Sequence, residues 1–349
     1  MAEALSVAEF LAEPGVVLDV RSPGEYEQGH IPGAVSFPLF TDEERAQVGI
    51  CYKHEGRDAA VELGFALVGP KLAGFIARAK ALAPDRTLRI HCWRGGMRSG
   101  SVAWALRMAG FHVTTLEGGY KAFRRWVLET FACPRPIVIV GGMTGCGKTE
   151  VLHALIAKGE QVLDLEAIAH HRGSSFGALG QTPQPTNEQF ENEAAVQWAS
   201  FSTKHPVWIE AESKRIGLCR VPEALFQQME RSPVLEIVRS REERIALLLN
   251  DYGDFAEADL IAATERIRKR LGGLRTQEAI AHISNKNLAA AMDIVLDYYD
   301  KTYTYDLQRR SVQQFPIDMI GLAPAASAER LMAEASHLLS PSAREVNQL

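Results

Sequence analysis

Apolar and polar positions alternate along the first third of the chain with two different periods. Short runs of β-branched and aliphatic residues predict strands over Val16–Val20, Leu88–His91 and Val113–Leu116. Between them, apolar residues recur at helical spacing over residues 72–83 and 101–109, which predicts two helices. Strands that alternate with helices in this way predict a parallel sheet covered by helices.

The same alternation resumes after a proline-rich junction, Cys133-Pro134-Arg135-Pro136, which can lie neither in a helix nor in a central strand. We therefore expect two domains of the α/β class, over residues 1–133 and 134–349. In the second domain the pattern predicts strands over Ile137–Val140, Val162–Leu165, Val207–Glu210 and Leu235–Val238. It predicts a mainly helical C-terminal part, with helices over residues 150–158, 241–249, 256–271, 287–299 and 328–339.

The composition is that of a globular protein and limits the kinds of partner. Of the 349 residues, 46% are hydrophobic and 23% are charged, close to the average for folded domains. The 38 Lys and Arg residues stand against 43 Asp and Glu residues, so that the formal net charge is −5. Any nucleic-acid site therefore has to be a local basic patch.

The cysteines and the N-terminus bear on the cellular compartment. Five cysteines are an odd and sparse set, which does not suit a disulfide framework and fits a reducing cytosol. The N-terminal residues include acidic side chains and lack the apolar core of a signal peptide. No uncharged apolar run approaches the roughly 20 residues that span a bilayer. We expect a cytoplasmic protein with no membrane partner.

A loop with one cysteine follows the strand predicted to end at His91. It reads His91-Cys92-Trp93-Arg94-Gly95-Gly96-Met97-Arg98-Ser99-Gly100 and opens the next predicted helix. Its backbone N–H groups can line an anion cradle at a helix N-terminus, here those of Gly95, Gly96 and Met97. These groups, together with the guanidinium groups of Arg94 and Arg98, favour the thiolate of Cys92, which is a candidate nucleophile. The alternative is an inert, buried cysteine.

The other cysteines lack this setting. Cys51 has no glycine-rich turn after it, and it is a candidate resolving thiol. No pair of cysteines has the spacing of metal ligands, so that we expect no zinc site.

Three segments in chain order resemble the motifs of rhodanese domains. They are Asp19-Val20-Arg21-Ser22-Pro23-Gly24-Glu25-Tyr26-Glu27-Gln28-Gly29-His30-Ile31-Pro32-Gly33-Ala34, the Cys92 loop, and Leu116-Glu117-Gly118-Gly119-Tyr120. The resemblance spans most of residues 10–132 and implies a rhodanese-like domain, in which the loop cysteine carries sulfur or selenium. The spacing from Cys92 to Arg98 also resembles the rhodanese-like dual-specificity phosphatases, which leaves phosphate-ester hydrolysis open.

A second glycine-rich loop, Gly142-Met143-Thr144-Gly145-Cys146-Gly147-Lys148-Thr149, fits the phosphate-loop pattern between a predicted strand and a predicted helix. Its candidate diphosphate-binding residues are Gly142, Gly145, Gly147, Lys148 and Thr149. Thr149 is also a candidate Mg²⁺ ligand, with Asp164 or Glu210 as the acidic residue beside it. Because the loop recognises a diphosphate rather than a base, a nucleotide ligand stays open.

Basic residues form three clusters in this acidic chain. The first is a candidate RNA-binding patch made of Arg266, Arg268, Lys269, Arg270 and Arg275; a solvated helix face is the alternative. The others are Lys214 with Arg215 and Arg220, and Arg239 with Arg241 and Arg244. The third cluster follows a predicted strand directly, so that we expect it to face ligand phosphate.

A rhodanese-like domain followed at once by a domain like those of phosphate-loop NTPases resembles the bacterial tRNA 2-selenouridine synthases over essentially the whole chain. Three further segments support this resemblance: Val48–Lys53, His170–Gly177 and Trp208–Gly217. The resemblance implies a transferase that replaces sulfur by selenium at the 2-position of the wobble 2-thiouridine in tRNA. It implies selenophosphate as the donor, and a geranylated 2-thiouridine intermediate made from geranyl diphosphate.

The resemblance also assigns roles to residues. Cys92 would carry selenium as S-selanylcysteine, with Arg94, Arg98 and the loop amides holding the anion. Residues 142–149 would hold the diphosphate of the geranyl donor. The implied partners are the anticodon arm of tRNA and an enzyme that produces selenophosphate, and no tightly bound cofactor is implied.

Two other functions are compatible with the same motifs. One is a rhodanese-type sulfurtransferase fused to a small-molecule kinase that never binds RNA. The other is a regulatory module, in which the first domain is a scaffold and the phosphate loop senses a nucleotide. The presence of Cys92 with both Arg94 and Arg98 argues against the second, because a scaffold needs none of them.

Overall fold

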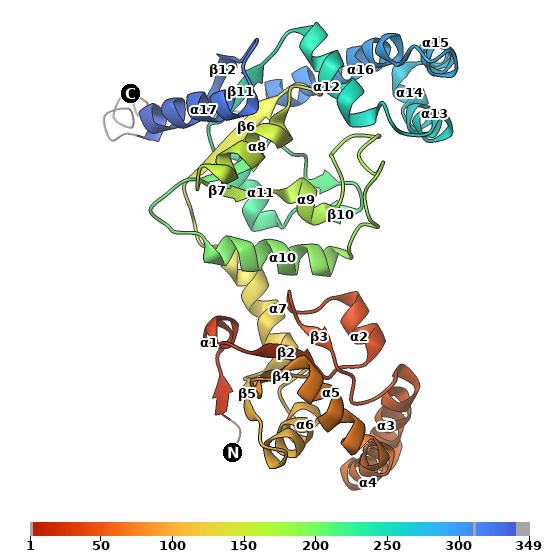
Figure 1. Cartoon of the computed structure of the whole chain (residues 1–349), viewed down its shortest axis with the longest axis vertical. Helices are drawn as coiled ribbons and strands as arrows, with labels where there is room; N and C mark the ends of the chain where they lie inside the picture. Colours follow the sequence, from red (N-terminus) through yellow and green to blue (C-terminus); the bar gives the residue numbers. More distant parts are fainter. Residues whose placement is uncertain (1–2, 310–311, 340–349) are drawn as a thin grey trace. The chain divides into compact units, whose positions relative to one another are not determined.

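The computed structural model describes residues 3–309 and 312–339 (Figure 1). The chain divides into two compact units. Unit 1 comprises Met1–Thr130 together with Glu191–Val196, and unit 2 comprises Phe131–Phe190 together with Gln197–Leu349.

Unit 1 is built on a five-stranded parallel sheet in the order β1-β5-β4-β2-β3. Its strands are β1 (Glu3–Leu5), β2 (Val16–Asp19), β3 (Val35–Ser36), β4 (Thr87–His91) and β5 (His112–Leu116). Its helices are α1 (Val7–Ala12), α2 (Pro23–Gln28), α3 (Asp42–His54), α4 (Arg57–Val68), α5 (Leu72–Leu82), α6 (Met97–Met108) and α7 (Gly119–Thr130), with a 3₁₀ turn η1 (Gly69–Lys71). The core packs β2 and β4 against α6, with Leu18, Ile90 and Leu106 fully buried.

Unit 2 contains a second five-stranded parallel sheet, in the order β12-β11-β6-β8-β7, and a short antiparallel pair. The sheet strands are β6 (Ile137–Gly142), β7 (Gln161–Leu163), β8 (Val207–Glu210), β11 (Val234–Val238) and β12 (Gln314–Asp318), and the pair is β9 (Arg215–Ile216) with β10 (Cys219–Arg220). One apolar core lies at this sheet and another lies among the C-terminal helices.

The helices that belong wholly to unit 2 follow the phosphate loop and the later strands. They are α8 (Lys148–Ala157), α9 (Leu165–Ala169), α11 (Glu223–Glu230), α12 (Arg241–Tyr252), α13 (Glu257–Arg266), α14 (Arg268–Leu271), α15 (Gly273–Ser284), α16 (Leu288–Arg309) and α17 (Pro324–Leu339). Helix α10 (Asn187–Ser200) contains residues assigned to both units.

The α/β class, the parallel sheets and the mainly helical C-terminal part are confirmed. Two predicted boundaries are wrong. The helix expected over residues 256–271 breaks at Ile267, which adopts φ −95° and ψ 0° between α13 and α14. The strand expected to reach Leu165 ends at Leu163, because the Asp164 carboxylate accepts a hydrogen bond from the Ala167 N–H and caps α9.

Several helices that the periodicity missed begin at capping boxes, in which a hydroxyl and a glutamate satisfy each other's backbone N–H groups. The reciprocal pairs are Ser6 with Glu9, Ser22 with Glu25, and Thr41 with Glu44. A fourth pair, Ser240 with Glu243, starts α12, a helix that the pattern does predict. Local hydrogen bonding rather than an apolar stripe therefore sets where α1, α2 and α3 start.

One continuous segment, Arg57–Leu82, has the length and the apolar composition of a membrane-crossing helix, and an 18-residue window within it has a mean hydropathy of 1.5. Only 11% of it is buried. In the structure this segment is α4, η1 and α5, and Pro70 lies in the 3₁₀ turn between the two helices. The segment therefore leaves an unusually apolar surface on unit 1.

A buried ion pair links the first rhodanese-like segment to the third. The Arg21 guanidinium donates to the Asp19 carboxylate, with Nη2 at 2.6 Å from Oδ2, and it stacks 3.6 Å from the centre of the Tyr120 ring. Burial alone would raise the pKa of Asp19, but His91 and Arg21 outweigh it and hold that pKa below its ordinary value of 3.8. The stability that the pair contributes is therefore complete above that value and is lost as the pH falls through the folded-state pKa.

We predict that Asp19→Asn destabilises unit 1 by roughly 3 kcal/mol, because the buried Arg21 charge loses its partner. Native-state hydrogen exchange of the amides in β2 and β4 measures the loss in the full chain. Glu27→Gln, at an exposed carboxyl group of the same unit, is the matched control and should leave exchange unchanged. Equal protection in both variants would contradict the role of the pair.

Candidate functional site

The Cys92 loop joins the end of β4 to α6, and Gly96 is the N-cap of that helix. Its carbonyl groups point backwards into the start of α7: the Tyr120 N–H donates to the Cys92 oxygen at 2.8 Å and the Lys121 N–H donates to the Trp93 oxygen at 2.9 Å. Gly119, at φ +61°, makes this contact possible, because a Cβ there would lie 2.4 Å from the Cys92 oxygen.

Cys92 is 97% buried and carries an activated thiol. Burial alone would raise its pKa, but the Ser99 hydroxyl, the Ser99 and Arg94 backbone N–H groups and the Arg98 charge outweigh burial and lower it. The Ser99 Oγ lies 3.2 Å from the Cys92 Sγ. The loop therefore favours a thiolate at the N-terminus of a helix.

The remaining residues predicted to form the cradle belong to the same loop and to the start of α6. Arg94, Gly95, Gly96 and Met97 are exposed on the loop. Arg98 is half-buried and donates to the Glu25 carboxylate at 2.7 Å, so that the first rhodanese-like segment fixes its position. Cys51 lies buried on α3, where burial and Glu55 raise the pKa of its thiol, which does not favour a reactive resolving thiol.

The phosphate loop joins β6 to α8 and lines a cavity of about 190 Å³ in unit 2. The predicted residues Gly142, Gly145, Gly147, Lys148 and Thr149 all line it. Lys148 Nζ donates to the Gly142 oxygen at 2.9 Å and lies 3.5 Å from the Glu210 carboxylate. Neighbouring anionic groups, Glu210 among them, raise the pKa of Lys148 in spite of burial, so that it stays charged.

The third arginine cluster does not face this cavity as a set of free cations. Arg239 Nε donates to the Cys146 oxygen at 3.0 Å, and Arg244 Nε donates to the Thr144 oxygen at 2.9 Å. Arg241 pairs with acidic residues of α16, at 2.5 Å from Asp293. The expectation that these arginines contact ligand phosphate therefore finds no support: two of them hold carbonyl groups of the phosphate loop.

Three buried glutamates, Glu166, Glu210 and Glu212, line the same cavity, and they offer oxygen atoms within 4.8 Å of one another. Burial and mutual repulsion raise the pKa of both Glu166 and Glu212. Of the two acidic residues singled out beside Thr149, Glu210 is in this cluster, whereas Asp164 accepts a hydrogen bond that caps α9.

The oxygen ligands of this cluster suit a Mg²⁺ ion. The Glu210 Oε2 atom is buried and has no hydrogen-bond partner among the residues that the structure describes, which leaves an acceptor for a cation. The residues present therefore fit the metal that the sequence suggested at Thr149.

The residues of the first basic patch lie on α13, α14 and α15. Arg266 donates to the Ser175 oxygen, Arg268 pairs with Glu265, Arg270 donates to the Tyr298 hydroxyl, and Arg275 pairs with Asp297. In the second cluster, Lys214 pairs with Glu223 and Arg215 and Arg220 are exposed. Lys269 is exposed and has no ion-pair partner within residues 4–303 and 312–339.

Sequence reasoning missed several residues of both sites as individual side chains. In unit 1 these are Glu25 and Ser99, and in unit 2 they are Glu166, Arg172, Glu212, Tyr299 and Tyr303. Arg172 and Glu212 fall inside two segments quoted above for the family resemblance, His170–Gly177 and Trp208–Gly217. These residues could have been predicted from those two segments, because both segments contribute residues to the cavity wall.

Profiles of two protein families match the two parts of this chain. The family profile of the tRNA 2-selenouridine synthase AAA domain matches residues 135–317, and that of the rhodanese-like domain matches residues 3–125. A crystal structure of the N-terminal domain of a protein from Clostridium difficile 630 is 41% identical, covers 36% of this chain and 99% of its own, and has a TM-score of 0.35.

Two relatives align along most of their length. A tRNA 2-selenouridine synthase from Marinobacter nauticus is 36% identical over 336 residues, which cover 84% of this chain and 89% of the relative. One from Shewanella denitrificans is 34% identical over 339 residues, which cover 87% of this chain and 91% of the relative. With both domain profiles in order and these identities over nearly the full length, the chain belongs to the tRNA 2-selenouridine synthase family.

Proposed function

We propose that this protein is a tRNA-modifying transferase that makes 2-selenouridine from the wobble 2-thiouridine of tRNA. The observation that carries the proposal is the activated Cys92 thiol in its cradle, on the same chain as a phosphate loop with a charged Lys148. The names of its relatives support tRNA as the substrate. Selenophosphate is the proposed selenium donor, supplied by the enzyme that produces it.

Cys92 is the proposed selenium carrier, as S-selanylcysteine, whose S–Se bond forms from the selenide-level selenium of the donor only with a two-electron oxidant such as a disulfide. The lowered pKa raises the fraction of nucleophilic thiolate relative to an ordinary cysteine. The exposed cradle amides at Gly95, Gly96 and Met97 and the guanidinium groups of Arg94 and Arg98 hold the anionic donor.

The phosphate loop is the proposed site of geranyl diphosphate. Lys148 and backbone N–H groups of the phosphate loop stabilise the diphosphate as it departs from the geranyl group, which passes to the thiouridine sulfur. A bound Mg²⁺ would be held by Thr149 and Glu210 and would offset the charge of the diphosphate. In this proposal the loop needs no energy-coupling role.

The proposed tRNA contacts are local, because the chain as a whole is acidic. The basic patch of α13 to α15 (Arg266, Arg268, Lys269, Arg270 and Arg275) can release counterions from an RNA backbone, although four of these side chains already have partners in the protein. If such a side chain exchanges its internal partner for a phosphate group, the gain in RNA-binding free energy becomes smaller but is not lost.

We predict that Cys92→Ser abolishes selenium incorporation while the fold and tRNA binding persist, because serine keeps the size of the side chain but not the thiolate. Nucleoside mass spectrometry of tRNA incubated with the variant, geranyl diphosphate and selenophosphate measures the product. Cys133→Ser, at an exposed cysteine, is the matched control and should retain activity. Wobble 2-selenouridine made by Cys92→Ser would refute the assignment.

We predict that Lys148→Ala lowers the rate of geranylation of 2-thiouridine by on the order of a hundredfold or more, because one charged donor to the diphosphate is lost. The same mass-spectrometric assay without selenophosphate isolates this step. Lys158→Ala, at the C-terminal end of the same helix, removes an exposed ion pair with Glu329 and should have no effect. Geranylation at the wild-type rate in Lys148→Ala would exclude the phosphate loop as the diphosphate site.

We predict that Ser99→Ala raises the pKa of Cys92 and moves the acidic limb of its alkylation profile to higher pH. The sign follows because the thiolate fraction at a given pH falls when the pKa rises. Iodoacetamide labelling across pH, read at the Cys92 peptide, is the measurement. Ser101→Ala on the same helix is the control, and coincident profiles for Ser99→Ala and the wild type would exclude the Ser99 contribution.

A further inference from the structure

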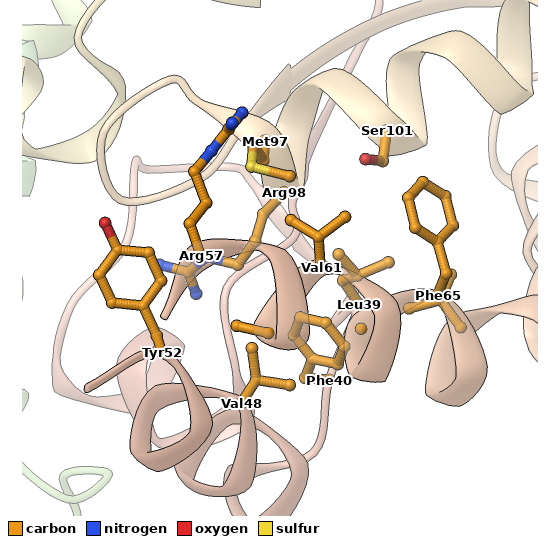
Figure 2. A pocket seen from close by; sticks show the side chains of 13 residues that line it. Leu39, Phe40, Val48, Tyr52, Arg57, Val61, Phe65, Met97, Arg98 and Ser101 are labelled. Carbon is orange, nitrogen blue, oxygen red and sulfur yellow. The ribbon is translucent and has the colours of Figure 1, made fainter. Parts of the chain in front are cut away.

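An apolar groove lies beside the Cys92 loop within unit 1. It consists of two adjoining cavities of about 150 Å³ and 420 Å³. Both are bordered by the same five residues, Leu39, Phe65, Val68, Met97 and Ser101. Helices α3, α4 and α5 form one wall and α6 forms the other, and Figure 2 shows the smaller cavity between them.

Large apolar side chains remain exposed at this groove. Phe65 is 62% exposed, Met97 52% and Trp104 63%. Phe65 belongs to the apolar segment Arg57–Leu82, of which only 11% is buried. A contiguous apolar surface of this kind on a globular domain marks a binding site rather than an ordinary surface.

The groove is continuous with the catalytic loop. Met97 and Arg98 are the first two residues of α6, and both border the smaller cavity. Ser99, the next residue, contacts the Cys92 thiol at 3.2 Å. A ligand whose chain lies in the groove can therefore hold a reacting atom attached to that chain near Cys92.

One end of the smaller cavity carries positive charge. In Figure 2 the side chains of Arg57 and Arg98 lie with Tyr52, away from Phe65 and Ser101. Arg98 is held by Glu25, whereas Arg57 has no hydrogen-bond or ion-pair partner within residues 4–303 and 312–339. The groove thus offers a hydrocarbon site that ends in an unpaired cation, which suits an apolar chain attached to an anionic polymer.

We propose that this groove binds the geranyl chain of the S-geranyl-2-thiouridine nucleotide when that nucleotide is presented to Cys92, with Arg57 facing the RNA backbone. The inference rests on the proposed function, in which the geranyl group is the only hydrocarbon chain among the reactants. It adds a second hydrocarbon-binding site, which acts after the diphosphate has left and recognises the modified nucleotide. The groove gives a physical reason for preferring the geranylated nucleotide to 2-thiouridine.

The test uses the full-length protein and a synthetic anticodon arm that carries either S-geranyl-2-thiouridine or 2-thiouridine. We expect the wild type to bind the geranylated RNA at least about tenfold more tightly, which burial of about two methylene groups supplies. Phe65→Glu should remove this preference and lower kcat/KM for selenium incorporation into the geranylated RNA by about tenfold or more. Leu128→Glu, at a 56% exposed position of α7 that does not border either cavity, is the control and should keep both.

Geranylation of 2-thiouridine RNA by Phe65→Glu should stay at the wild-type rate, which also shows that the variant is folded. Absence of the binding preference in the wild type, or its retention in Phe65→Glu, would overturn the groove assignment even where selenium is incorporated. Failure of the wild type to convert geranylated RNA at all would instead refute the proposed function. A third outcome would overturn the proposal in favour of a membrane surface. In that outcome the wild type floats with anionic phospholipid vesicles and shows no preference between the two RNAs, and Phe65→Glu no longer floats.

Discussion

The direction of the peptide groups in two strand-to-helix loops is the constraint on which both sites depend. A loop can present its N–H groups to an anion only while its carbonyl groups point elsewhere and are satisfied there. In unit 1 the carbonyl groups of Cys92 and Trp93 accept hydrogen bonds from the first turn of α7. The close approach of Gly119 to the Cys92 oxygen leaves no room for a side chain, so that this contact fixes the residue type as well as the loop.

The phosphate loop of unit 2 meets the same constraint with side chains. The guanidinium groups of Arg239 and Arg244 donate to the Cys146 and Thr144 oxygens, and both arginines are more than 90% buried. These two arginines therefore hold the carbonyl groups of the phosphate loop in place. Their charge also adds to the positive electrostatic potential at the loop. Basic residues after β11 can therefore favour binding of an anionic ligand without contacting it.

The elements and residues that could be predicted from the sequence are those whose pattern lies within one short, continuous segment. Buried parallel strands appear as short aliphatic runs, and β8 matches its predicted bounds because all its residues are buried. Cys92 and Lys148 were found because each lies in a compact loop with its glycines. Contacts such as Glu25 with Arg98 join distant segments, and no periodicity or spacing within one segment encodes them. Helices α3 and α4 were missed for a different reason: much of their apolar surface faces solvent, so that they lack the one-sided stripe of a core helix.

The charge balance of the phosphate-loop cavity constrains what it can bind. Lys148 and Arg172 supply positive charge, and Arg172 is paired with Asp251, while Glu166, Glu210 and Glu212 lie buried with oxygen atoms within 4.8 Å of one another. Burial raises the pKa of each of these carboxyl groups, and the charge of Glu210 adds to the rise for Glu166 and Glu212, because ionised carboxylates at this separation repel each other. Entry of a diphosphate adds negative charge to the same cavity and raises the cost further. The bound state therefore requires that protons or a divalent cation accompany the diphosphate, and the unpartnered oxygen of Glu210 is the atom best placed to accept either.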